Sequence, residues 1–233
     1  MNGFMIQCKS RKTELLQYLG IMAGAFVLGF IILLIVMGQI KENESATAGT
    51  MIAAVIIIFI HFFATSISFV GEFNLAVSMG ATRKNFVANY ALFNMAEILL
   101  LELVLLIFGN LEKFIVNRLF PNIVMEIDMT KFFDWKYLLM IIVIFTVAEI
   151  FIGAVILRFG MKFLWVLWAV WMLAALLPIN ISKNEKLSAE LAKIGLMIGG
   201  KITPAGIVAA VSLVCLILIV ITWKILKRQR VTA

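Results

Sequence analysis

Long apolar runs alternate with short polar stretches along this chain, and the pattern predicts a polytopic helical membrane protein. Six of the runs reach the roughly 17–25 residues that an α-helix needs to cross a bilayer. None of them alternates with the period of two that a strand of a membrane β-barrel requires. We therefore expect an all-α fold with six transmembrane helices. The spans fall near residues 15–38, 50–70, 87–109, 137–158, 163–179 and 204–224.

Composition and charge place the chain in a membrane and orient it. With 64% hydrophobic residues, 14% charged residues and a mean hydropathy of +1.09, it does not fit a soluble domain. Of its 20 Lys and Arg residues, 11 lie on the side that would hold both termini, close to the ends of the spans. The positive-inside rule then predicts cytoplasmic termini for one multi-pass domain over residues 1–233. The net charge of +7 favours anionic membrane lipid as a partner and argues against nucleic acid.

Four polar residues of the second span share one helical stripe. Spaced at i, i+4, i+7 and i+11, they are His61, Thr65, Ser68 and Glu72. Polar side chains that face lipid are costly, so this stripe should contact protein or a water-filled path. Two interpretations stay open, a translocation path and ordinary hydrogen bonding between helices. Glu72 lies at the membrane boundary and is better placed to brace the segment that follows.

Acidic residues also interrupt the third and fourth spans. Glu97 and Glu102 are five residues apart, roughly 140° around a helix, so they do not form one paired-carboxylate site. Glu149 lies in the fourth span. Pairing with groups on neighbouring helices is the favoured interpretation of these intramembrane acids, and a proton relay is the alternative.

The fifth span carries a row of aromatic residues, Trp165, Trp168 and Trp171, followed by Met172. A single Trp near a membrane surface is a common anchor. Three that step inward form an adaptable wall that would suit amphipathic cargo. Packing against lipid or other helices is the plainer explanation of the same row.

The sequence offers little for catalysis or metal binding. It contains a single histidine, so a metal site of the usual kind is not expected. The run from Gly195 to Ile202 nearly matches a phosphate-binding loop, but Ile202 stands where Ser or Thr would hold magnesium. We therefore expect no enzyme activity, no bound cofactor and no nucleotide-binding domain in this chain.

Two outer loops carry further helical patterns. Residues 111–136 contain one that Pro121 interrupts, and residues 183–201 contain another. Either pattern could form a helix on the membrane surface or a re-entrant helix, and for residues 111–136 an ordinary structured loop is the alternative.

The polar segment between the second and third spans is the most informative part of the chain. From Gly71 to Phe86 its sequence is GEFNLAVSMGATRKNF. It has an acid near its start and the pair Arg83 and Lys84 near its end. This pattern predicts a short interfacial helix on the cytoplasmic side that a soluble partner could bind.

Six spans, no attached ATPase and this segment resemble the ABC-2 type permease subunits of Gram-positive bacteria. In that family the segment has an acidic-aromatic start and ends in Gly-x-(Ser/Thr)-Arg-(Lys/Arg)-x-Phe, which matches Gly80 to Phe86 here. The resemblance implies a six-helix half-transporter with a type V exporter-like architecture in the bacterial cell membrane. Such a subunit would pair with a second permease subunit, as a homo- or heterodimer. A separate cytoplasmic ABC ATPase would hold ATP and Mg²⁺.

The resemblance also assigns roles to residues. The coupling helix that docks on the ATPase would include Glu72, Phe73, Leu75, Met79, Gly80, Arg83, Lys84 and Phe86. Spans two and five line the cargo path in related exporters. Here that path would include His61, Thr65, Ser68, Trp168 and Met172. Residues 183–201 would match a re-entrant region before the last span.

We therefore expect the permease subunit of an exporter that moves a hydrophobic or amphipathic compound, such as a peptide, an antimicrobial or a lipid-like molecule. Two alternatives stay open. One is an ion-coupled secondary carrier that uses Glu97 or Glu149. The other is a membrane sensor or assembly protein that transports nothing.

Overall fold

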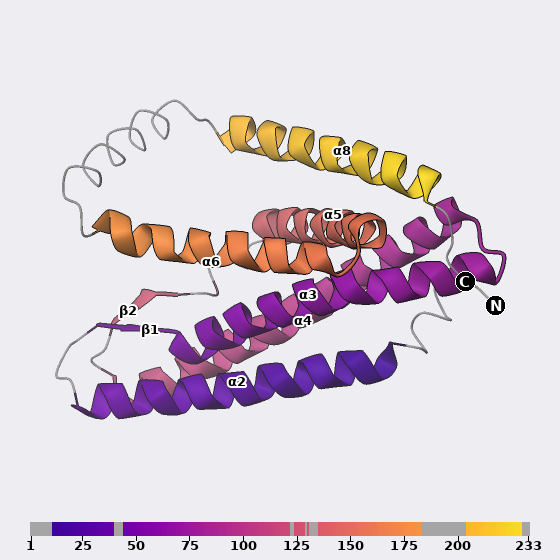
Figure 1. Ribbon diagram of the computed structural model, residues 1–233. Helices are drawn as coiled ribbons and strands as arrows, with labels where there is room; N and C mark the ends of the chain where they lie inside the picture. Colours follow the sequence, from indigo (N-terminus) through magenta and orange to yellow (C-terminus); the bar gives the residue numbers. More distant parts are fainter. Residues whose placement is uncertain are drawn as a thin grey trace.

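The computed structural model of the protein is a bundle of long helices (Figure 1). It describes residues 11–39, 44–121, 124–128, 130, 135–182 and 204–229. Within these ranges the elements, in chain order, are α2 (Lys12–Gln39), β1 (Glu44–Ala46), α3 (Ala48–Ser78), α4 (Arg83–Leu119), β2 (Val124–Ile127), α5 (Trp135–Phe159), α6 (Lys162–Ser182) and α8 (Pro204–Arg228).

Each of the six apolar runs lies on a helix, which confirms the all-helical membrane-type fold. Five helices are long and apolar enough to cross a membrane: α2, α3, α4, α5 and α8. Helix α6 contributes a shorter apolar stretch of described residues, Lys162–Leu173. Large apolar side chains cover the outside of these helices, among them Leu28, Ile107 and Val214. A soluble protein does not expose such surfaces, and a bilayer covers them. The crossing of a membrane by all six helices stays a prediction.

The separate interfacial helix predicted for Gly71–Phe86 is absent. Helix α3 continues to Ser78, a turn follows, and α4 begins at Arg83. Phe73 extends the buried face of α3 beyond the predicted end of the span, which keeps the chain helical. The chain reverses at Gly80, whose φ of +87° favours glycine. The Thr82 side chain then caps α4 by accepting a hydrogen bond from the backbone N–H of Asn85 (3.3 Å).

The third helix is also longer than predicted at its other end. Residues 111–119, predicted to be part of an outer loop, are the last turns of α4. The helix ends at Leu119, two residues before Pro121, because proline disfavours helical conformation in the residue that precedes it. Beyond it, β2 pairs in parallel with β1, with Glu44 opposite Val124. The other helical loop, residues 183–201, and the phosphate-loop-like run within it lie outside the described residues.

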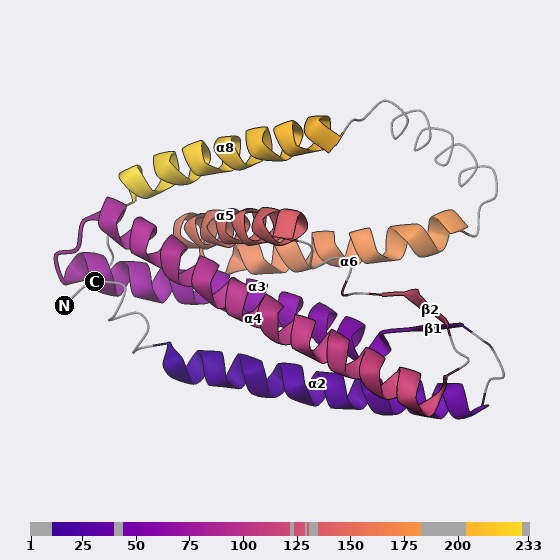
Figure 2. The same cartoon turned by 180° about the vertical axis from the view of Figure 1, so that it is seen from behind.

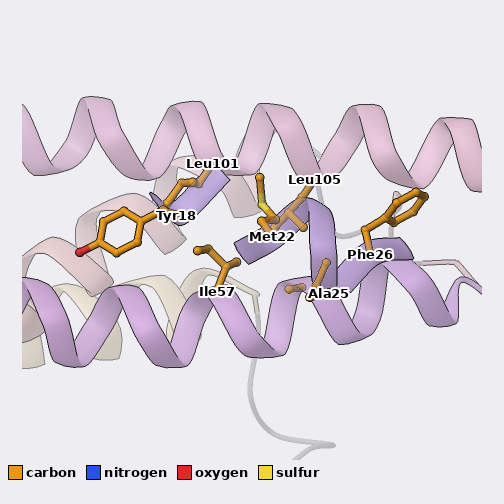
Figure 3. Close-up of a cluster of buried hydrophobic side chains, with 9 residues drawn as sticks. Tyr18, Met22, Ala25, Phe26, Ile57, Leu101 and Leu105 are labelled. Atoms are coloured by element: carbon orange, nitrogen blue, oxygen red, sulfur yellow. The ribbon is translucent and has the colours of Figure 1, made fainter. Parts of the chain in front are cut away.

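Helix α3 lies at the centre of the bundle and packs against α2, α4 and α5, while α8 packs on α5. Figure 3 shows Tyr18, Met22 and Phe26 of α2 beside Ile57 of α3 and Leu101 of α4. The helices α2 and α3 approach closely where two glycines meet. A Cβ atom on Gly29 would lie 2.9 Å from the Cα atom of Gly49.

Two acids stabilise the end of the bundle near the strands. The buried Glu112 of α4 caps α3, because it accepts hydrogen bonds from the backbone N–H groups of Gly49 and Thr50, each at 2.8 Å. Lys113 Nζ lies 2.5 Å from Asp128, which directly follows β2. Burial raises the pKa of Asp128, but hydrogen bonds from Lys113 and Thr130 outweigh it and hold that pKa below its ordinary value.

Candidate functional site

The hairpin formed by α3 and α4 is locked near its tip by four aromatic rings. Phe69 and Phe73 of α3 pack against Phe86 and Tyr90 of α4, with ring centroids 5.0 to 5.5 Å apart between the two helices. The Tyr90 hydroxyl donates a hydrogen bond of 2.7 Å to the carbonyl oxygen of Thr65. Buried rings with a satisfied hydroxyl hold the two helices in one geometry. The tip of the hairpin is therefore a rigid element.

The tip exposes a small apolar surface. Leu75 is 59% exposed and Met79 is 70% exposed. Figures 1 and 2 show that the hairpin extends past the start of α2 and the end of α8. Of the residues predicted for a coupling helix, Leu75, Met79 and Gly80 are exposed at this tip, while the exposed Lys84 lines a cavity with residues of α5 and α8. Phe73 and Phe86 are buried in the aromatic lock instead.

Arg83 is not part of that exposed surface. Its guanidinium donates hydrogen bonds to the carbonyl oxygens of Leu226 (2.8 Å), Lys227 (2.6 Å) and Gln229 (2.7 Å) at the end of α8. The last carbonyl groups of a helix lack partners in the helical ladder, and a cation at a helix C-terminus is favourable. The Leu226 oxygen also accepts a 3.4 Å hydrogen bond from the backbone N–H of Gln229. Arg83 was predicted to contact an ATPase, and the structure places it in a link between α4 and α8.

A buried arginine lies behind the hairpin. Arg11, the residue before α2, is 1% exposed. Its guanidinium lies 3.2 Å from Glu97 of α4 and 3.6 Å from Glu72 of α3. It also pairs with Glu14 at 3.0 Å and lies over the ring of Tyr90. One cation thus joins three helices. Arg11 is one of the 11 basic residues that orient the chain, and the sequence pattern does not predict its burial.

The contacts of Arg11 with Glu97 lead to further buried polar groups around His61. The Nδ1 atom of His61 lies 2.9 Å from Glu149 Oε1 of α5, and the Nε2 atom of His61 lies 3.5 Å from Glu97 Oε2 of α4. Asn94 of α4 donates a short hydrogen bond to the other oxygen of Glu149. We call Arg11, His61, Glu97 and Glu149 the buried charge cluster. Glu97 and Glu149 thus contact groups on neighbouring helices, as predicted for the intramembrane acids, whereas Glu102 has no such contact among the described residues.

The predicted polar stripe of the second span is only partly in this cluster. His61 is a member, while Thr65 and Glu72 contact Arg11. Ser68 is half-buried and has no polar contact among the described residues. The stripe faces the interior of the bundle, which explains why its polar groups avoid lipid.

An aromatic groove lies on another face of α3, against α6. It has a volume of about 590 Å³. Its lining includes Phe59, Phe62, Phe63, Phe145 and Trp171. The ring of Trp171 packs against that of Phe59 at 5.2 Å. The predicted cargo path is therefore not one surface, because His61 and Thr65 face the bundle, and Trp168 and Met172 are outside the groove lining. Trp171 is the aromatic residue of α6 that faces α3.

No family model, curated protein or solved structure compared with this chain matches it. The fold alone therefore defines the class, a multi-pass, helical membrane-type protein with a rigid helical hairpin and a buried charge cluster. Among the described residues, no three His, Cys, Asp or Glu side chains are grouped so that they could hold a metal ion.

Proposed function

We propose that this chain is the membrane subunit of an ATP-driven exporter and works with a separate cytoplasmic ABC ATPase. The observation that carries the proposal is the rigid α3–α4 hairpin with Leu75 and Met79 exposed at its tip. The same end of the bundle carries the basic residues Arg158, Lys162, Lys224, Lys227 and Arg228, and this bias favours the cytoplasmic side. Apolar side chains in contact with water at this end favour a protein partner.

The contacts of the hairpin explain how a partner could move the rest of the bundle. Glu72 and Glu97 connect the hairpin to Arg11 at the start of α2. Arg83 connects it to the end of α8. An ATPase that shifts the tip would therefore pull on helices at both sides of the bundle. Coupling of this kind needs two arrangements of the bundle whose populations nucleotide binding changes.

The aromatic groove supports a hydrophobic or amphipathic cargo. Its lining between α3 and α6 is almost entirely apolar, with phenylalanine and tryptophan rings. Such surfaces bind compounds of varied shape without directional bonds. A second permease subunit, identical or related, would complete the transporter.

The experiment is co-purification of the tagged chain with ABC ATPases from its native membrane, in mild detergent. We expect Met79→Asp to abolish ATPase recovery, because the charge disrupts the apolar tip. Met161→Asp is the matched control, since Met161 is an exposed methionine in the α5–α6 turn at the same end of the bundle. Equal recovery from wild type and Met79→Asp would overturn the proposed docking surface. No ATPase from a stably folded wild-type preparation would overturn the exporter.

A further inference from the structure

The two ring nitrogens of His61 both face carboxylate oxygens. Glu149 approaches Nδ1 at 2.9 Å and Glu97 approaches Nε2 at 3.5 Å. A neutral imidazole has one N–H donor and one lone pair. With two ionised carboxylates, a neutral ring would turn its lone pair towards one of them. With one additional proton on the three side chains, both ring nitrogens would carry an N–H group, Nδ1 in a hydrogen bond with Glu149 and Nε2 at ion-pair distance from Glu97.

The charges of the buried cluster lead to the same conclusion. Arg11 carries one positive charge, and the carboxylates of Glu97 and Glu149 carry two negative charges. The cluster therefore holds one uncompensated negative charge unless a proton is added, and such a charge is very costly in a low-dielectric interior. Glu14 and Glu72 also contact Arg11, but both are partly exposed and can be solvated.

A cavity connects this cluster with a further acid. It has a volume of about 120 Å³ and lies between α3, α4 and α5, with His61 and Glu102 in its lining. Glu102 is 6% exposed, and its Oε2 atom has no hydrogen-bond partner among the described residues. The other residues in its lining are apolar, so water molecules in this cavity would bind to His61 and Glu102. Glu102 and water could therefore carry protons to His61.

We propose that His61, Glu97 and Glu149 form a binding site for one exchangeable proton, and that the cavity lined by Glu102 gives the proton access to it. Along the helix axes, the backbone positions of these residues cover 11 residues of α3 from Glu72 to His61 and a further five of α4 from Glu97 to Glu102, about 24 Å at 1.5 Å per residue. That distance is most of the roughly 30 Å hydrocarbon core of a bilayer. The site goes beyond the proposed export activity and exists with or without an ATPase.

The polar and charged groups around His61 together determine whether its imidazole binds the additional proton. Tyr18 of α2 lies with its ring 5.3 Å from the imidazole. The neighbouring polar and charged groups are Arg11 and Glu14 at the start of α2, Thr65, Ser66 and Glu72 on α3, Tyr90, Asn94, Glu97 and Glu102 on α4, and Thr146 and Glu149 on α5. Arg11 is the cation among them, and Glu97 and Glu149 are the carboxylates in contact with the imidazole.

The chain contains one histidine, so NMR of protein labelled with ¹⁵N-histidine reports on His61 alone. In nanodiscs at pH 7 we expect both ring nitrogens to carry protons. Glu149→Gln removes one negative charge, and we expect His61 to lose one of the two protons at the same pH. Glu112→Gln is the matched control, because this buried acid of α4 caps α3 and does not contact His61. It should leave both protons in place.

A second measurement tests access through the cavity. Glu102→Leu removes the carboxylate from the lining, and we expect the ring N–H protons to exchange with water at least about tenfold more slowly. A neutral His61 in the folded wild-type protein at pH 7 would overturn the proton site. Unchanged exchange in Glu102→Leu would overturn the access path. Neither measurement uses an ATPase, so their failure is separate from a failure of the exporter proposal.

Discussion

The Arg83 guanidinium lies 2.8 Å from the carbonyl oxygen of Leu226, so the first residue of α4 fastens the last turn of α8. The contact closes the hairpin end of the bundle. A second link at the same end runs from Gln229 to the carbonyl oxygen of Leu157 in α5, at 3.1 Å. The hairpin tip thus exposes Leu75 and Met79, while Arg83 attaches the start of α4 to the end of α8.

Replacing Arg83 should loosen α8. In Arg83→Gln, the loss of charge-assisted hydrogen bonds at a partly exposed site should lower stability by about 1–2 kcal/mol. Thermal unfolding in detergent and limited proteolysis after residue 226 would measure this effect. Lys84→Gln is the control, because Lys84 is an exposed neighbour for which a change within about 0.5 kcal/mol is expected. Equal melting temperatures for both variants would show that the link contributes nothing.

The approach of α2 to α3 depends on glycine at position 29. In Gly29→Ala the new Cβ atom would lie 2.9 Å from the Cα atom of Gly49, so the two helices must separate. We expect a loss of about 1–3 kcal/mol. The control is Gly24→Ala on the same helix, where a Cβ atom meets nothing within 4 Å. That change should stabilise α2 by about 0.5–1 kcal/mol, because alanine favours a helix more than glycine does. A similar stability of the two variants would contradict the close packing.

The pair of Lys113 and Asp128 should make stability depend on pH. Because the pKa of Asp128 in the folded protein lies below its ordinary value of 3.8, the pair stabilises the fold above that value. This contribution is lost as the pH falls from that value through the lower pKa of the folded protein. Melting temperatures of wild type and Asp128→Asn, measured from about pH 7 to about pH 2, should differ at neutral pH and converge in acid. A constant difference over this range would exclude the titration of Asp128 as its cause.

The helices could be predicted from the sequence because length and apolarity alone determine which segments can cross a bilayer. The residues at which the helices begin and end were harder to predict. The sequence pattern predicts a separate interfacial helix for the polar segment around Ser78, yet Phe73 and Phe86 keep its two halves in the adjoining helices α3 and α4. Polar spacing within α3 correctly indicated an inward face for His61 and Thr65.

The partners of that inward face could not be predicted. Arg11 precedes a span, where most basic residues face lipid headgroups, and only tertiary packing brings it to Glu97. The choice of Trp171 rather than Trp168 as the ring that faces α3 depends on the rotation of α6 against its neighbour. Periodicity within one helix contains no information on that rotation.

The aromatic groove gives the last prediction, which concerns cargo. Trp171 packs on Phe59 in the groove lining, whereas Trp165 is 72% exposed and outside it. In nanodiscs, binding of a fluorescent amphipathic peptide should weaken about tenfold in Trp171→Ala, the equivalent of about 1.4 kcal/mol. Trp165→Ala should bind as the wild type does. An equal loss in both variants would indicate general partition onto exposed aromatic rings. If neither variant binds the peptide more weakly, the groove is not part of the cargo path. A peptide bound in the groove would contact the Trp171 ring in its lining, so the loss of that ring would weaken binding.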